Sequence, residues 1–121
     1  IGGHPIEDIS PVTDVESLRR ARATAADVTV ESEVRDYVTR LVDFTRDHAS
    51  LGASPRAGIS LLQAAQGRAI LEGRDYVIPD DIKDEARPVL VHRIRATPSS
   101  AIGDENAQEI VDKALSRISP N

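Results

Sequence analysis

A short stretch in the middle of the chain, Leu51–Ala57, decides the fold; it reads LGASPRA. Ser54 is a good N-cap residue, because its hydroxyl can accept a hydrogen bond from a free backbone N–H group of a first helical turn. Pro55 then takes the first helical position, where its fixed φ angle suits a helix and its missing N–H group costs nothing. The sequence therefore predicts a helix that begins at Pro55.

Arg56 falls in the first turn of that predicted helix. The N-terminus of a helix carries a partial positive charge, so a carboxylate is favoured there and a cation is not. An arginine beside free backbone N–H groups makes sense when an anion binds, and phosphate is the obvious anion. We interpret Arg56 as a candidate phosphate contact that Ser54 and Pro55 position. The alternative is a surface arginine paired with one of the 20 acidic residues.

The remaining sequence predicts a mainly α-helical chain with a core of Leu, Ile, Val and Ala. Apolar residues at helical spacing, together with capping signals, predict five helices, at about 13–24, 32–47, 55–72, 79 onward and 105–118. Thr45 continues the apolar face of the second of these helices. Gly73 is expected to close the third helix, and Pro88 is expected to interrupt the fourth.

Two short segments have the pattern of β-strands. Val28–Val30 and Tyr76–Ile78 are rich in β-branched or aromatic residues, and they flank the second and third predicted helices. We expect these segments to pair as one small antiparallel element.

The composition argues against several kinds of function. The chain has no cysteine, and its three histidines (His4, His48 and His92) lack the spacing of a metal site. No apolar run approaches the length that spans a membrane. The net charge of −5 opposes a nucleic-acid surface. Neither lysine, Lys83 or Lys113, follows a glycine, so a phosphate-binding loop is absent and we expect no catalytic residue in this chain.

Several segments in order carry a family resemblance. Gly52–Ala57, followed by Leu71–Val77, Pro79–Ile82 and Val89–Arg93, resembles the carboxy-terminal lid domain of MoxR-type AAA+ ATPases over roughly residues 4–96. In that family the arginine of the Ser-Pro-Arg segment is the sensor 2 residue, which reaches from the lid toward the γ-phosphate of ATP. The resemblance therefore implies a small helical AAA+ lid-type bundle in which Arg56 senses phosphate.

The resemblance also implies a division of the chain. Residues 1–12 would form an extended linker from an ATPase core that precedes Ile1, since the chain reads as an excised fragment. Residues 13–97 would form the helical lid, and residues 98–121 a loop followed by a C-terminal helix.

The function that the resemblance implies is the coupling of ATP binding and hydrolysis to chaperone-like remodelling of partner proteins. ATP and magnesium would be cofactors of the parent protein, with none bound by this fragment alone. The expected partners are the upstream core, further copies in a hexameric ring, and client proteins with von Willebrand factor A domains. We expect a cytoplasmic protein that binds neither membrane nor nucleic acid.

Two other readings remain open. The first is a stand-alone helical protein-interaction module that does not bind nucleotide. The second, which the acidic balance disfavours, is a helical DNA-binding domain.

Overall fold

The computed structural model describes residues 5–49, 51–95 and 106–121. Over these ranges the chain is mainly α-helical, as the sequence predicted. Its helices are η1 (Pro5–Asp8), α1 (Val15–Ala26), α2 (Ser32–His48), α3 (Pro55–Leu71), α4 (Pro79–Leu90), η2 (Val91–Arg93) and α5 (Ala107–Arg117), of which η1 and η2 are 3₁₀ helices. The predicted α-helices therefore exist, with ends that differ by a few residues.

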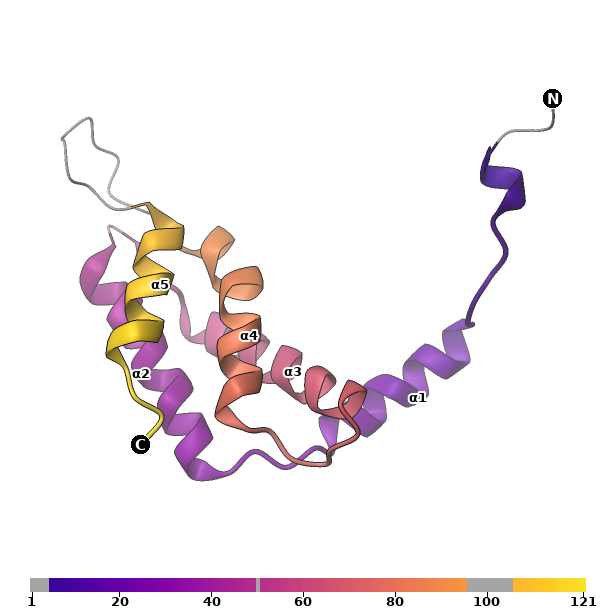
Figure 1. Ribbon diagram of the computed structural model, residues 1–121, viewed down its shortest axis with the longest axis horizontal. Coiled ribbons are helices and arrows are strands. Elements are labelled where there is room, and N and C mark those ends of the chain that lie inside the picture. The colour runs from indigo at the N-terminus through magenta and orange to yellow at the C-terminus, as the bar shows by residue number, and fades with distance from the viewer. Residues whose placement is uncertain (1–4, 50, 96–105) are drawn as a thin grey trace.

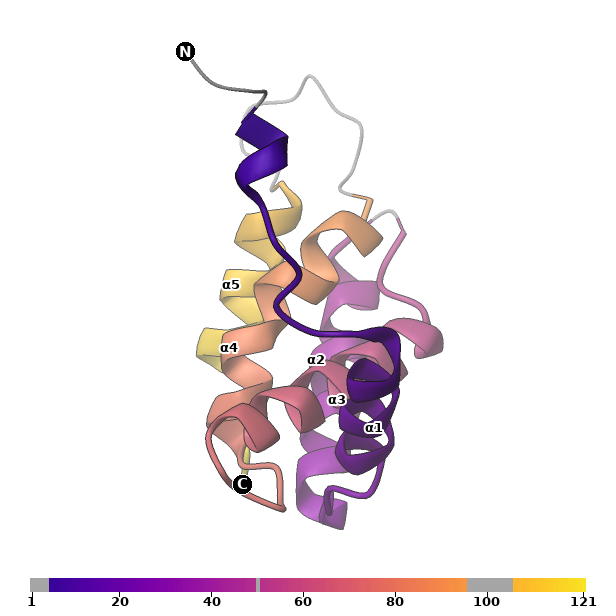
Figure 2. The same cartoon turned by 90° about the vertical axis from the view of Figure 1, so that its right-hand side faces the viewer.

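The helices form a bundle around α3. Figure 1 shows α2 and α4 rising from the same end of the molecule while α5 runs the opposite way beside them. α3 packs against α4, α2 and α1, whereas α5 packs against α2 and α4. α1 lies against α3 at one end of the bundle, as Figure 2 shows from the side, and none of its residues is buried.

Small residues on α3 allow the neighbouring helices to approach it closely. Ala57, Ala65 and Ala69 are fully buried together with Leu61 on the inner face of α3. The larger core side chains come from the surrounding helices, with Leu41 on α2, Leu90 on α4 and Val111 on α5 among them. α5 thus shares one core with the rest of the bundle.

The predicted strand pair is present only as a single bridge, and its predicted direction is wrong. Thr29 pairs with Tyr76 in a parallel bridge, in which the Thr29 N–H donates to the Asp75 carbonyl and the Val77 N–H donates to the Thr29 carbonyl, both at 2.9 Å. The two segments run the same way because each leads into a helix, α2 or α4, that begins at the same end of the bundle (Figure 1).

The prediction that Pro88 interrupts the fourth helix is wrong. Pro88 lies inside α4, which continues to Leu90. Pro88 has no N–H group to donate to the carbonyl of Asp84, four residues earlier. Asp84 is exposed, so water can donate to that carbonyl instead. The linker predicted at residues 1–12 is not extended throughout, because Pro5–Asp8 form η1. The loop predicted to begin at residue 98 and to precede the C-terminal helix lies outside the described residues.

A buried ion pair fixes the turn between α3 and α4. Both terminal nitrogens of Arg74 donate to the carboxylate of Asp81 at 2.7 Å, and Asp81 also accepts from the backbone N–H of Ile78 at 2.9 Å. Burial alone would raise the pKa of Asp81, whose side chain is 3% exposed. The hydrogen bonds and the positive charge of Arg74 outweigh burial and hold that pKa below its ordinary value.

The Asp81 pair predicts how stability depends on pH. A carboxyl whose pKa is lower in the folded than in the unfolded chain contributes stability above the unfolded pKa of about 3.9. That contribution is lost as pH falls from there through the folded pKa. Asp81→Asn should therefore lower the free energy of unfolding near pH 7 by about 2 kcal/mol and flatten its decline in acid. Urea denaturation at a series of pH values measures both effects. The control is Asp80→Asn, at an exposed neighbour, and an identical acid response in Asp81→Asn and the unmodified chain would contradict this account.

Gly67 predicts a gain in stability on substitution. It lies well inside α3, and a Cβ atom there would meet nothing within 4 Å. Gly67→Ala should raise the free energy of unfolding by about 0.5–1 kcal/mol, because alanine loses less backbone entropy in a helix. Gly73 is the contrasting control, since its φ of 78° disfavours any side chain, and Gly73→Ala should destabilise the chain. A loss of stability in Gly67→Ala would show that the position has a structural constraint.

Candidate phosphate-contacting site

The start of α3 follows the capping pattern expected from the sequence. Ser54 has an extended backbone, and its hydroxyl accepts a hydrogen bond from the Ala57 N–H at 3.3 Å. Pro55 is the first helical residue. The first turn of α3 contains no acidic residue, whereas the first turns of α1, α2, α4 and α5 each contain at least one. The partial positive charge of this helix end is therefore left without a carboxylate.

Arg56 adds a full positive charge at the same place. Its side chain is exposed, and it forms no ion pair or hydrogen bond with any other residue of the described ranges. The alternative, in which an acidic side chain forms an ion pair with Arg56, is therefore not seen within these ranges. A guanidinium with free donors, beside a helix N-terminus that has no carboxylate, can bind the oxygens of a phosphate.

Two side chains of α2 hold the backbone that precedes α3. Ala53 is fully buried, its N–H donates to the Thr45 hydroxyl at 3.0 Å, and its carbonyl accepts from Arg46 Nε at 3.2 Å. The Thr45 hydroxyl in turn donates to the Val42 carbonyl at 2.7 Å. We call this arrangement of Thr45, Arg46 and Ala53 the Ala53 clamp. It fixes both polar groups of the residue next to the N-cap.

The neighbours of Ala53 are fixed as well. Gly52 lies so close to α2 that a Cβ atom there would stand 2.4 Å from Arg46 Cα and 2.6 Å from its backbone nitrogen. Leu51 forms an antiparallel bridge with Arg95, in which each residue donates its N–H to the other's carbonyl, at 3.1 and 2.8 Å. Contacts with two separate parts of the chain thus set the direction in which α3 begins.

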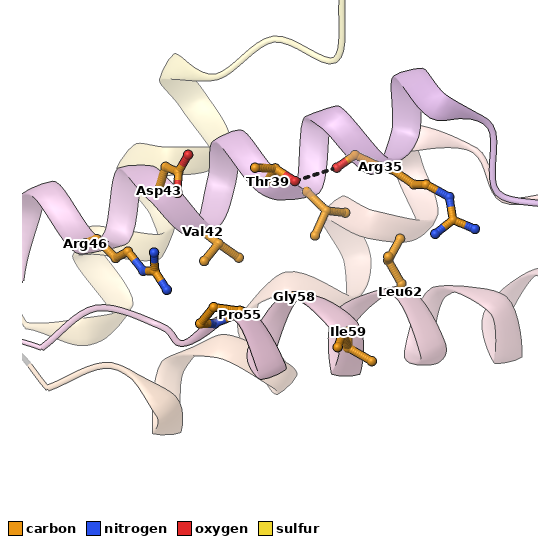
Figure 3. Close-up of a pocket in the computed structure, with 10 residues that line it drawn as sticks. Arg35, Thr39, Val42, Asp43, Arg46, Pro55, Gly58, Ile59 and Leu62 are labelled. Atoms are coloured by element: carbon orange, nitrogen blue, oxygen red, sulfur yellow. Dashed lines mark hydrogen bonds between the residues drawn. The ribbon is translucent and has the colours of Figure 1, made fainter.

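An apolar groove adjoins this helix start. It has a volume of about 350 Å³ and lies between α2 and α3, where Val38, Val42, Ile59 and Leu62 line it. Figure 3 shows Arg46 near Pro55 at one end and Arg35 at the other. Arg56 is not part of this lining, so the groove and the candidate phosphate contact are adjacent but separate surfaces.

The sequence pattern predicted the roles of Ser54, Pro55 and Arg56, but it did not predict the Ala53 clamp. In the sequence Thr45 continues an apolar helix face, whereas in the structure its hydroxyl is the acceptor for the Ala53 N–H. A threonine on a face made mostly of apolar residues was the available signal, because a buried hydroxyl needs a hydrogen-bond partner.

The described ranges hold neither a cluster of possible metal ligands nor a helix that could span a membrane. Within them, no three histidine, aspartate or glutamate side chains gather to hold a metal ion. His48 instead stacks on Phe44, with 3.9 Å between ring centroids, and its Nδ1 lies 2.9 Å from the Phe44 carbonyl. No described helix has the length and apolar character to cross a bilayer.

Comparison with known proteins identifies the family of the chain. Residues 44–114, more than half of the chain, match the AAA lid domain family. YeaC of Bacillus subtilis, described as uncharacterized, is 38% identical over 95% of this chain and 37% of its own length. The chaperone MoxR1 of Mycobacterium tuberculosis is 39% identical over 78% of this chain and 28% of its own length. The chain thus spans 37% of the length of YeaC and 28% of the length of MoxR1.

A solved structure shares the fold. The crystal structure of a proposed ATPase from Cytophaga hutchinsonii superposes with a TM-score of 0.73 at 29% sequence identity, over 80% of this chain and 33% of that one. The family match covers the start of α3 and the whole clamp, and the relatives include MoxR proteins. The chain therefore belongs to the AAA lid domain family and is a lid of the MoxR-type AAA+ ATPases.

Proposed function

We propose that Arg56 is the sensor 2 residue of this lid and contacts the terminal phosphate of ATP held by an AAA+ core in the same chain. The observation that carries the proposal is the exposed, unpaired guanidinium at the acid-free start of α3. Ser54 and Pro55 position it by starting the helix. The Ala53 clamp supports the role, because a rigid backbone limits how far the arginine can drift from a bound phosphate.

The proposed mechanism is electrostatic. The Arg56 guanidinium bridges oxygens of the γ-phosphate while ATP is intact, and it stabilises the charge that develops during hydrolysis. When the γ-phosphate leaves, that contact is lost, and the lid turns relative to the core because its affinity for the two nucleotide states differs. The core supplies the phosphate loop and holds ATP with Mg²⁺, and this lid binds neither on its own.

The family also suggests a wider role for the parent protein. MoxR1 is named a chaperone, and we propose that the parent protein likewise remodels partner proteins in a homo-oligomeric, hexameric ring. Client proteins with von Willebrand factor A domains and a cytoplasmic location are part of the same proposal. Residues 1–12 would connect the core to the lid at 13–97, and residues 98–121 would complete the domain.

Arg56→Ala in the full-length protein tests the sensor role. Because Arg56 is exposed and unpaired within the described ranges, the change should alter the free energy of unfolding by less than about 0.5 kcal/mol. Loss of a contact to the developing charge should lower ATP turnover by on the order of 10²-fold. Steady-state ATPase rates and thermal melting measure the two effects.

The controls for Arg56 separate charge from geometry. Arg56→Lys keeps the charge but loses the planar fork, so its turnover should lie between those of Arg56→Ala and the unmodified protein. Arg117→Ala removes another exposed arginine, at the end of α5, and should leave turnover unchanged. Full turnover by a normally folded Arg56→Ala protein would refute the sensor role and favour the stand-alone interaction module.

Gly52→Ala tests whether the clamp region matters for turnover. The added Cβ atom would overlap the backbone of Arg46, so the change should destabilise the protein by about 1–3 kcal/mol and lower turnover by displacing Arg56. Gly58→Ala is the matched control, because its Cβ would make only ordinary 3.6 Å contacts with Val38 and Val42. Urea denaturation and ATPase rates report on both. Unchanged stability and turnover in Gly52→Ala would show that the loop can shift without moving the site.

A further inference from the structure

A second, larger groove lies between α1 and α3. It has a volume of about 760 Å³, and its lining combines Arg19, Arg22 and three alanines of α1 with Gln63, Gln66 and Gly67 of α3. The lining contains no acidic side chain. α1 buries none of its residues, so the space beside it is not filled by described parts of this chain.

The charge of this groove is opposite to that of the chain. Arg19 and Arg22 are three residues apart and therefore lie on one face of α1. Both are exposed, and neither forms an ion pair or hydrogen bond within the described ranges. Arg20, by contrast, donates to the Ser17 hydroxyl at 3.3 Å and does not line the groove. In a chain of net charge −5, two unpaired arginines facing one groove are suited to an acidic ligand.

The α3 side of the groove is polar and open. Gln66 fixes its edge, because its amide donates to the Val28 carbonyl at 3.0 Å. Gly67, another lining residue, leaves open space beside the helix backbone, since a Cβ atom at that position would meet nothing within 4 Å. Packing within the described ranges does not require glycine there, although glycine weakens a helix. A glycine in such a place permits another chain to approach the helix backbone closely.

We propose that the α1–α3 groove binds an acidic polypeptide segment of a partner protein. Arg19 and Arg22 would pair with its carboxylates, and the exposed Gln63 amide can both donate to and accept from its peptide groups. A polypeptide fits better than a nucleic acid, because the groove offers two cations and the chain as a whole would repel a phosphate backbone. The proposal goes beyond the sensor role and does not depend on it.

The test measures binding of a fluorescein-labelled octaglutamate peptide to the chain by fluorescence anisotropy. The peptide should bind, and its affinity should fall as salt is added. Arg19→Gln/Arg22→Gln should weaken binding by about fivefold or more, the size expected for exposed ion pairs. Arg20→Gln/Arg117→Gln changes the net charge equally outside the groove and should alter binding by less than about twofold.

Gly67→Leu supplies a test that leaves charge unchanged. Leucine should fill the groove and weaken peptide binding, while thermal melting should show no loss of stability because leucine is a strong helix former. Unchanged peptide binding in a folded Gly67→Leu chain would place the peptide outside the groove and overturn the proposal.

Four other results would also overturn it. One is the absence of peptide binding, and another is equal weakening by the two double variants, which would indicate general charge attraction. The third is tighter binding of an eight-nucleotide oligothymidylate, or displacement of the peptide by ATP, because either would assign the groove to phosphate ligands. The last is self-association in sedimentation that Arg19→Gln/Arg22→Gln abolishes, which would assign the groove to a second copy of the chain.

Discussion

The hydrogen bonds that α2 makes to Ala53 are the constraint on which the candidate site depends. A helix N-terminus can be aimed only as well as the backbone that precedes it, and a loop between two helices is ordinarily free to shift. Here Thr45 and Arg46 bind both polar groups of Ala53, and the close approach of Gly52 to α2 leaves the loop little room. Since α2 is itself packed in the core, the start of α3 inherits the rigidity of the bundle.

The same arrangement explains why a cation at this helix start is tolerated. Arg56 opposes the helix dipole, and an exposed charge of this kind destabilises a helix by less than about 1 kcal/mol. The Ser54 cap and the pre-shaped Pro55 offset that cost within the first turn. The small electrostatic cost of Arg56 can therefore be tolerated at the surface. When an anion binds, both Arg56 and the helix dipole attract it.

Features determined within a few residues could be predicted from the sequence, and features determined by distant segments could not. The start of α3 was predictable because a cap and a first-position proline act within one turn. The direction of the bridge between Thr29 and Tyr76 depends on where α2 and α4 begin in space, and no local pattern records that. The role of Thr45 was hidden for the same reason, since its partner lies eight residues away across a turn.

The inner and outer faces of α3 have different roles, the first in packing and the second in the proposed contacts. Its inner face is rich in small residues that allow α2 and α4 to pack closely, which places α3 at the centre of the bundle. Its outer side carries Arg56 in the first turn and Gly67 about three turns later, at 1.5 Å per residue some 16 Å along the axis. A rigid helix cannot reorient one end without the other. If phosphate at Arg56 sets the position of the lid, the α1–α3 groove must move with it, and a segment bound there would be displaced in step with hydrolysis.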